Sequence, residues 1–423
     1  MLGRIAASWR TGSLLKGVVG TSGVNFLVLI VNLLVGVLAA RALGEWGRGV
    51  YAGVQAWFIL SLVLSEVGQS AAVTYFAAKR DYSVTSIVRS ARRIMFVGGF
   101  LVSIVWFLFA EMLSAGSELA YFAFLIAIGG CFVNFMFSPW LFALQSIDIK
   151  LWNYSRLVQP LVMVFIVIGI WTIDAISVVS LTSGLVISTF SSSLAAKVML
   201  SLLQRSRSGV NSRVRYPDLL RYGGAYTFSA IPSTGSAMLD RLALTRLVEP
   251  GVLGQYSVAQ TVISVAGPLG TAVSSAAFPM LSAESVGRKG RLRRELFLVF
   301  ASGFSVLAAA CSLAFLGPFL IPIVFGREFV GSIQYLWWLV PVVAVRCIAQ
   351  IEATVLRARG RPSYPAVAEV VGLAVSFVLV GVLFGQYGVV GVPIAIFGGL
   401  SVTVLVSGGF LGFVSSSMRG TNG

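Results

Sequence analysis

Two stretches of the chain place polar side chains on one face of an otherwise apolar helix. Between residues 222 and 246 the polar positions are three or four apart, which is the spacing of a single helical face: Tyr226, Ser229, Ser233, Ser236 and Asp240. Between residues 17 and 39 the same spacing aligns Asn25 with Asn32. Hydroxyl and amide groups can bind sugar hydroxyls, although small polar residues also allow helices to pack closely. The two asparagines and the aspartate favour a polar cavity.

A few charged side chains lie inside apolar stretches: Glu66, Asp240, Arg241, Arg346, Glu352 and Glu369. Each costs about 2.5–3.5 kcal/mol near the centre of a membrane helix, so each should face protein or water. Arg346 is the deepest arginine, and a guanidinium can bind two phosphate oxygens at once. An internal ion pair with a carboxylate explains Arg346 equally well. We expect Glu352 and Glu369 to meet the basic cluster 357–361, and Asp240 and Arg241 to pair with neighbours.

The composition is that of a protein that crosses a membrane many times. Of its 423 residues 57% are apolar and only 11% are charged, against about 25% charged in soluble proteins. About twelve apolar segments are long enough to span a bilayer. We expect an all-α fold with helices at 17–39, 50–76, 94–113, 119–141, 157–175, 177–199, 222–246, 255–281, 296–322, 332–356, 364–385 and 390–414. The chain has no histidine, and we expect no metal, no cofactor and no catalytic residue.

The basic residues predict the orientation of the chain in the membrane. Most of the 31 lysines and arginines lie on alternate connections, and the positive-inside rule then places both termini in the cytoplasm. This asymmetry and contact with anionic lipids account for the net charge of +16, so we expect no nucleic-acid partner. Residues 1–16 suit a short helix on an anionic membrane surface. The first apolar run is too long for a signal peptide, and we expect it to be retained.

An internal repeat divides the chain into two halves. The pairs Arg41 and Arg246, Gly49 and Gly254, Tyr51 and Tyr256, and Gln55 and Gln260 all share an offset of 205 positions. We therefore expect two six-helix lobes, 1–199 and 222–423, joined by a basic cytoplasmic linker, 200–221. Because six is even, the copies are parallel, which is typical of transporters with a central cavity that work by alternating access.

The repeat places the stretches 40–49 and 246–255 at equivalent external turns. We expect Arg41 and Arg246 to cap the ends of their own helices, where carbonyl groups are exposed. Helix 50–76 then carries Tyr51, Gln55, Leu62 and Glu66 on one face. Glu66 is matched by a threonine in the second half, so it is an asymmetric carboxylate inside the membrane. It either carries a coupling proton or cation, or makes a structural hydrogen bond or ion pair.

A series of motifs along the chain resembles a known family. They are RALGEWGRGVYAGVQAW, the Glu66-Val67-Gly68 triplet, DRLALTRLVEPGVLGQYSVAQ, FPMLSAE, IVFGREFVGS, VLRARGRP and YGVVGVPIA. In this order they are similar to polysaccharide flippases of the Wzx type, in the multidrug/oligosaccharidyl-lipid/polysaccharide exporter superfamily. The resemblance implies movement of undecaprenyl-pyrophosphate-linked oligosaccharide from the cytoplasmic to the outer leaflet of the bacterial inner membrane. It also implies coupling to an ion gradient, of H⁺ or Na⁺, or to the membrane potential.

The sequence is also compatible with other functions. Lipid II flippases of the superfamily typically carry two further helices, which this chain lacks. A cation-coupled drug exporter would favour a cavity rich in carboxylates, whereas a diphosphate favours arginine. A membrane-bound polysaccharide polymerase or ligase would need a long external loop or a carboxylate cluster, and the predicted outer loops are short.

Overall fold

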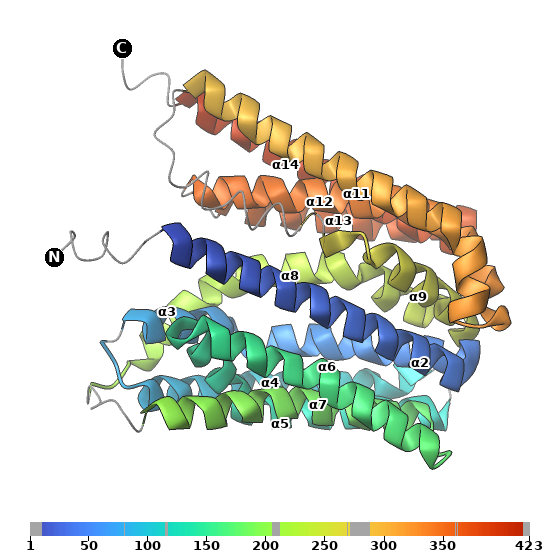
Figure 1. Cartoon of the computed structure of the whole chain (residues 1–423), viewed down its shortest axis with the longest axis horizontal. Helices are drawn as coiled ribbons and strands as arrows, with labels where there is room; N and C mark the ends of the chain where they lie inside the picture. Colours follow the sequence, from blue (N-terminus) through green and yellow to red (C-terminus); the bar gives the residue numbers. More distant parts are fainter. Residues whose placement is uncertain are drawn as a thin grey trace.

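The computed structural model describes residues 11–79, 81–114, 117–204, 212–268, 270, 288–359, 361 and 363–417 (Figure 1). All regular secondary structure within these ranges is helical. The α-helices are α2 (Thr11–Glu66), α3 (Gln69–Lys79), α4 (Val84–Ser114), α5 (Glu118–Ile147), α6 (Ile149–Thr172), α7 (Val178–Gln204), α8 (Tyr216–Leu247), α9 (Pro250–Ser264), α11 (Arg288–Val324), α12 (Ile333–Ala358), α13 (Ser363–Tyr387) and α14 (Gly391–Ser417). Two short 3₁₀ helices, η1 (Arg327–Ser332) and η2 (Gly388–Val390), precede α12 and α14.

The helices cross the membrane about twelve times, as predicted. Eight helical spans among the described residues are long and apolar enough to cross a bilayer. Two of these, Gly23–Glu66 with 44 residues and Ser363–Phe413 with 51 residues, are each long enough for two passes at about 20 residues a pass. Helix α8, which is more polar, and the described part of the predicted helix 255–281 account for the remaining passes. Residues 271–281 of that predicted helix lie outside the described ranges.

The helices form two bundles. Helices α3 to α7 pack mainly on one another and on α2, and α11 to α14 pack mainly on one another. Helices α2, α8 and α9 make extensive contacts both within their own bundle and with the other one. Figure 1 shows α11 to α14 on one side and α4, α5 and α7 on the other, with α2, α8 and α9 between them. Each bundle has its own apolar core, around Val54 and Phe135 in the first and around Tyr256 and Phe329 in the second. Helices α7 and α8 extend into both ends of the predicted linker.

The predicted turn within residues 40–49 is present, and it occupies a single residue of α2. Gly44 has φ 65° and ψ −179°, and the backbone is helical on both sides of it. Glycine adopts this left-handed φ without a steric penalty, so no loop is needed between the two passes. Arg48, which we expected in the external turn, therefore lies inside the second pass of α2.

The two bundles touch at a pair of repeat-related glycines near this turn. A Cβ atom on Gly49 would lie 1.7 Å from the Pro250 carbonyl oxygen, and one on Gly254 would lie 1.9 Å from that of Glu45. Residues related by a two-fold operation meet each other only close to its axis. Gly49 and Gly254 therefore mark the axis that relates the two bundles. Beside them, Gln255 Nε2 donates to Glu45 Oε2 at 2.6 Å.

Two arginines of the repeat connect the bundles at the same end of the molecule. The Arg41 side chain donates to the carbonyls of Ile323 and Val324, the last residues of α11, with Nε 2.7 Å from the Val324 oxygen. Arg246 Nη1 donates to the Met112 carbonyl, close to the end of α4, at 3.3 Å. Both arginines thus cap helix ends, where a cation is favourable. The helices are those of the opposite bundle, which corrects the prediction that each arginine caps its own helix.

The bundles also meet at the opposite end, where α2 gives way to α3. Val67 and Gly68 have positive φ angles of 47° and 64° and separate the two helices. A Cβ atom on Gly68 would lie 2.0 Å from the carbonyl oxygen of Gly223 on α8. Tyr75 stacks on Tyr222 with ring centroids 4.3 Å apart. The described residues therefore close the interface at two places, which we call the Gly44 end and the Gly68 end.

Candidate functional site

A cavity of about 520 Å³ lies between the two bundles. Helices α2, α6 and α7 line it from the first bundle, and α8 and α9 line it from the second. Its wall is mixed in character, with aliphatic and aromatic side chains interrupted by polar ones. The polar lining residues are Asn32, Arg48, Tyr51, Gln55, Gln159, Ser188, Thr189, Arg241, Thr261 and Ser264.

Arg48 contributes a cation to the cavity from the first bundle. Its side chain is only 6% exposed, and it lies one residue before the glycine contact at the Gly44 end. Nη2 is 3.4 Å from the Thr261 hydroxyl on α9, while the buried Nε has no hydrogen-bond partner among the described residues. Buried polar groups are nearly always hydrogen-bonded in native proteins. The unpaired Nε therefore makes Arg48 an energetically costly residue at this position.

Arg241 contributes a second cation, from α8 in the other bundle, and a chain of hydrogen bonds fixes it. Its Nε donates to Gln260 Oε1 at 2.5 Å. The amide of Gln260 in turn donates to Asp240 Oδ2 at 2.5 Å, and the Tyr256 hydroxyl donates to the same oxygen at 3.2 Å. Asp240 is 2% exposed and does not line the cavity. Its carboxylate is thus a buried anchor that orients Arg241 through Gln260.

The two guanidinium groups create a positive site that spans both bundles. They are close enough to repel each other electrostatically, and burial strengthens that repulsion. None of the described residues that line this cavity is acidic. An anion with several oxygens would relieve the repulsion and accept hydrogen bonds from both arginines. The hydroxyl and amide groups around them can hydrogen-bond to sugar hydroxyls.

Of the eight substrate-binding residues predicted from the sequence, the cavity includes Arg241 and Asn32. Asp240 lies next to Arg241 but is buried behind it. The structure does not bring Tyr226, Ser229 and Ser233 to this cavity. They lie on the part of α8 nearer the Gly68 end, where Tyr226 is 47% exposed.

Arg346 and Asn25 make contacts with protein rather than with the cavity. Arg346 Nη2 is 3.3 Å from the Ser236 carbonyl oxygen on α8, and its charge interacts with Asp240. Asn25 Oδ1 accepts a hydrogen bond from Arg156 Nη2 at 3.0 Å, which joins α2 to α6. Both residues therefore stabilise the packing of helices in this structure.

Sequence reasoning missed Arg48 as a residue of the cavity, and it did not assign Gln159 and Thr189. Gln159 Nε2 donates to the Thr189 hydroxyl at 3.2 Å, across α6 and α7. A signal for Arg48 was present, because Arg48, Tyr51 and Gln55 are three and four residues apart and so share a helical face. The predicted helix 50–76 begins after Arg48, so this arginine was assigned to the external turn and not to that face.

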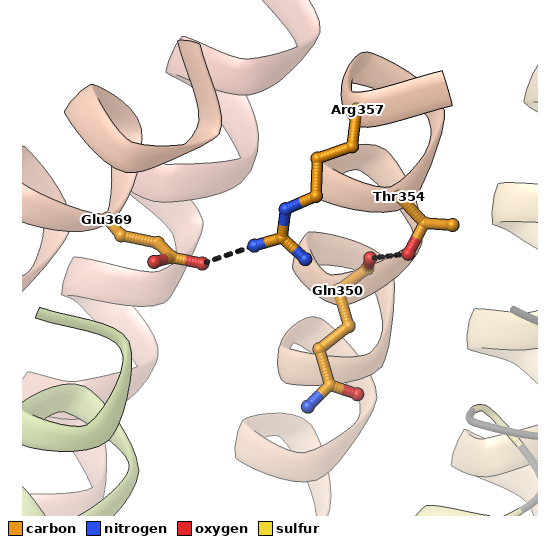
Figure 2. A network of polar contacts seen from close by, with 4 residues as sticks. All are labelled: Gln350, Thr354, Arg357 and Glu369. Atoms are coloured by element: carbon orange, nitrogen blue, oxygen red, sulfur yellow. Dashed lines mark hydrogen bonds and ion pairs between the residues drawn. The ribbon is translucent and has the colours of Figure 1, made fainter. Parts of the chain in front are cut away.

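The remaining membrane carboxylates lie outside this cavity. Glu369 on α13 pairs with Arg357 on α12 at 3.9 Å, as expected, and Figure 2 shows this contact beside Gln350 and Thr354. Glu352 does not join that pair: its Oε2 is buried and has no hydrogen-bond partner among the described residues. Glu66 is the last residue of α2 and interacts with Ser70 across the break at Val67 and Gly68.

The fold is shared with solved membrane transporters. A lipid II flippase, MurJ, in an inward closed conformation has a TM-score of 0.73 at 15% identity, covering 92% of this chain and 87% of that one. An inward-facing multidrug transporter of the MATE family has a TM-score of 0.71 at 15% identity, covering 94% of this chain and 96% of that one. The same family in an outward-facing conformation has a TM-score of 0.60 at 17% identity, covering 96% and 97%. No curated protein is similar enough in sequence to match.

The two bundles and the cavity between them define a polytopic membrane protein with the fold of the solved MurJ and MATE transporters. The sequence model of the polysaccharide biosynthesis protein family matches residues 14–284. The chain belongs to this family.

Proposed function

We propose that the protein is a flippase that moves undecaprenyl-pyrophosphate-linked oligosaccharide across the bacterial inner membrane. In this proposal the lipid enters from the cytoplasmic leaflet and leaves in the outer one. The Gly68 end then faces the cytoplasm with both termini, as the distribution of basic residues predicts. Residues 1–199 and 222–423 act as two rocking lobes around the cavity, and residues 200–221 act as the linker.

The observation that carries the proposal is the pair Arg48 and Arg241 in a cavity whose described lining residues include no carboxylate. One arginine comes from each bundle, so a diphosphate bound to both would hold the bundles together around the substrate. Arg48 lies directly beside Gly49, the contact that closes the Gly44 end. Binding of the diphosphate is therefore well placed to change the stability of that closure, which alternating access requires. Membership of the polysaccharide biosynthesis family supports a glycan cargo.

The two arginines also bear on which alternative cargo fits the cavity. Two arginines disfavour an amphipathic cation, so we place a drug exporter below a diphosphate carrier. A lipid II flippase would bind the same diphosphate chemistry and remains the second candidate. The family and the fold are those of transporters rather than of a polymerase or ligase.

Reconstituted full-length protein should distinguish these cargoes. Proteoliposomes would receive a fluorescent polyprenyl-diphosphate sugar, its monophosphate analogue or a fluorescent amphipathic cation, and transfer between leaflets would be followed with an impermeant quencher. We expect the diphosphate to cross at least about tenfold faster than the monophosphate, because the second phosphate can engage the second arginine. Movement of the cation without movement of the diphosphate would contradict the proposal. An impermeant thiol reagent on Gln386→Cys, at the exposed end of α13, would report which way the protein is inserted.

For the energy source, we propose that Glu66 is the coupling site. It lies in the membrane at the Gly68 end, next to the strained Val67 and the glycine contact between the bundles. A change in its charge would act directly on the closure of that end. The alternative is that its interaction with Ser70 only fixes the break between α2 and α3.

Glu66→Gln keeps the shape of the side chain and removes its charge. We expect this variant to transport at a rate that no longer responds to an imposed H⁺ or Na⁺ gradient across proteoliposomes, whereas the parent accelerates. Glu118→Gln makes the same change at the exposed start of α5 and should behave like the parent. A parental gradient response in Glu66→Gln would exclude Glu66 as the coupling site.

A further inference from the structure

A second hollow lies on the surface of the first bundle, where α4 and α5 meet, away from the cavity between the bundles. Its volume is about 370 Å³. Three arginines line it at the Gly68 end of α4, followed by apolar residues deeper in the membrane: Arg89, Arg92, Arg93, Phe96, Val97, Phe135 and Met136. We call this hollow the α4–α5 groove. None of these residues lines the central cavity.

A packed aromatic side chain forms the floor of the groove. Phe135 is 1% exposed, and a Cβ atom on Gly99 would lie 2.1 Å from its ring. The missing side chain at Gly99 thus allows the Phe135 ring to sink between the helices. Phe96 on α4 packs edge-on against Phe132 on α5 at 5.9 Å. These contacts make the wall of the groove apolar next to the arginines, on the side that lies deeper in the membrane.

In the described part of the chain, no carboxylate neutralises the charges of the groove. Arg89, Arg92 and Arg93 are all exposed, and none of them makes an ion pair with a carboxylate among the described residues. Arg93 Nη1 donates to the neutral hydroxyl of Tyr216 at 2.5 Å. Three positive groups at one end of an apolar wall match a molecule with a negative head and a long apolar tail.

The surface of α4 between the groove and the Gly44 end indicates the chemistry of the tail that would lie there. The exposed face of α4 continues with large apolar side chains toward the Gly44 end: Phe100, Leu101, Ile104, Phe107 and Leu108, between 44% and 72% exposed. Such a face in a membrane protein contacts acyl chains. A lipid whose phosphate binds the arginines would therefore have its chains along α4.

We propose that the α4–α5 groove binds an anionic phospholipid of the cytoplasmic leaflet. The phosphate contacts Arg89 and Arg92, and an acyl chain lies against Phe96, Val97 and Met136. The leaflet follows from the proposed orientation of the chain, whereas the chemistry of the groove does not depend on the cargo. The undecaprenyl-linked cargo is the less suitable occupant, because it must reach the central cavity and this groove lies outside it.

Native mass spectrometry of the purified full-length protein can test this with phosphatidylglycerol and phosphatidylcholine of identical acyl chains. We expect phosphatidylglycerol to bind the parent at least about tenfold more tightly, and Arg89→Gln/Arg92→Gln to lose most of that preference. Arg213→Gln/Arg215→Gln removes the same charge from exposed positions on the same side of the membrane and should keep the preference. Met136→Trp fills the groove without changing a charge and should weaken phosphatidylglycerol binding.

Three results would overturn the proposal. One is an unchanged preference in Arg89→Gln/Arg92→Gln, and another is an equal loss in both arginine pairs, which would indicate a general surface charge. The third is displacement of phosphatidylglycerol from the parent by stoichiometric polyprenyl diphosphate, which would assign the groove to the cargo. If the arginine variant fails to fold, Met136→Trp decides the question, and normal phosphatidylglycerol binding by that variant would equally refute the site.

Discussion

Replacing Arg48 by glutamine is expected to lower transport of a polyprenyl-diphosphate sugar by about 10- to 100-fold. The glutamine loses one or more charge-assisted hydrogen bonds to the diphosphate, and each such bond contributes about 1.5–3 kcal/mol. The same change is expected to leave the protein at least as stable as the parent. Arg48 is 6% exposed, its Nε has no hydrogen-bond partner in the described ranges, and Arg241 repels it. Removing its charge therefore relieves an unfavourable interaction in the protein without ligand.

Opposite changes in rate and stability distinguish a binding role from a structural one. Transport in proteoliposomes gives the rate, and thermal unfolding of the purified protein gives the stability. Arg48→Lys should retain part of the rate, because lysine keeps the charge but cannot bind two phosphate oxygens in the same way. Arg327→Gln, at an exposed position outside the cavity, is the matched control and should change neither quantity. If Arg48→Gln transports normally, the diphosphate does not bind here; if its unfolding temperature falls sharply, Arg48 is structural.

Gly49→Ala is expected to open the Gly44 end of the molecule. The added methyl group would lie 1.7 Å from the backbone oxygen of Pro250, and a backbone atom cannot rotate away as a side chain does. The two bundles must separate there, and overpacking of this kind costs about 1–3 kcal/mol. A shift of this size changes the population of the open state by about 5- to 150-fold. Transport should fall, because a site that cannot close on one side cannot alternate.

A cysteine in the cavity can measure this opening. Ser264→Cys places a thiol in the cavity wall, and an impermeant reagent added at the Gly44 side should label it faster when Gly49→Ala is also present. Gly129→Ala and Gly169→Ala are the controls, since nothing lies within 4 Å of a Cβ atom at either helical glycine. Equal labelling rates with and without Gly49→Ala would show that the glycine contact does not seal the cavity.

The repeat explains why both bundles contribute to each closure. Arg41 and Arg246 are equivalent in sequence, and each caps a helix of the opposite bundle. Equivalent residues of two parallel copies meet equivalent surfaces across the axis. The contacts at the Gly44 end are thus a symmetric set that must break together when the bundles rock apart.

The architecture of this protein could be predicted from its sequence because the membrane imposes local rules. Every backbone group in the bilayer must be paired within its own helix, so an apolar run of about 20 residues is enough to identify a pass. The common offset of Arg41, Gly49 and Tyr51 from their partners then predicted two parallel copies. None of these inferences requires knowledge of which helices are neighbours.

The composition of the cavity depended instead on contacts between residues far apart in the chain. Arg48 lines it because the chain reverses at Gly44 alone and because Gly49 and Gly254 bring the bundles together beside it. Asp240, expected to face the substrate, is turned inward by Tyr256 and Gln260, whose repeat partners Tyr51 and Gln55 line the cavity. A helix has the same periodicity whichever face is buried, and only its packing against neighbouring helices selects the side chains that reach the cavity.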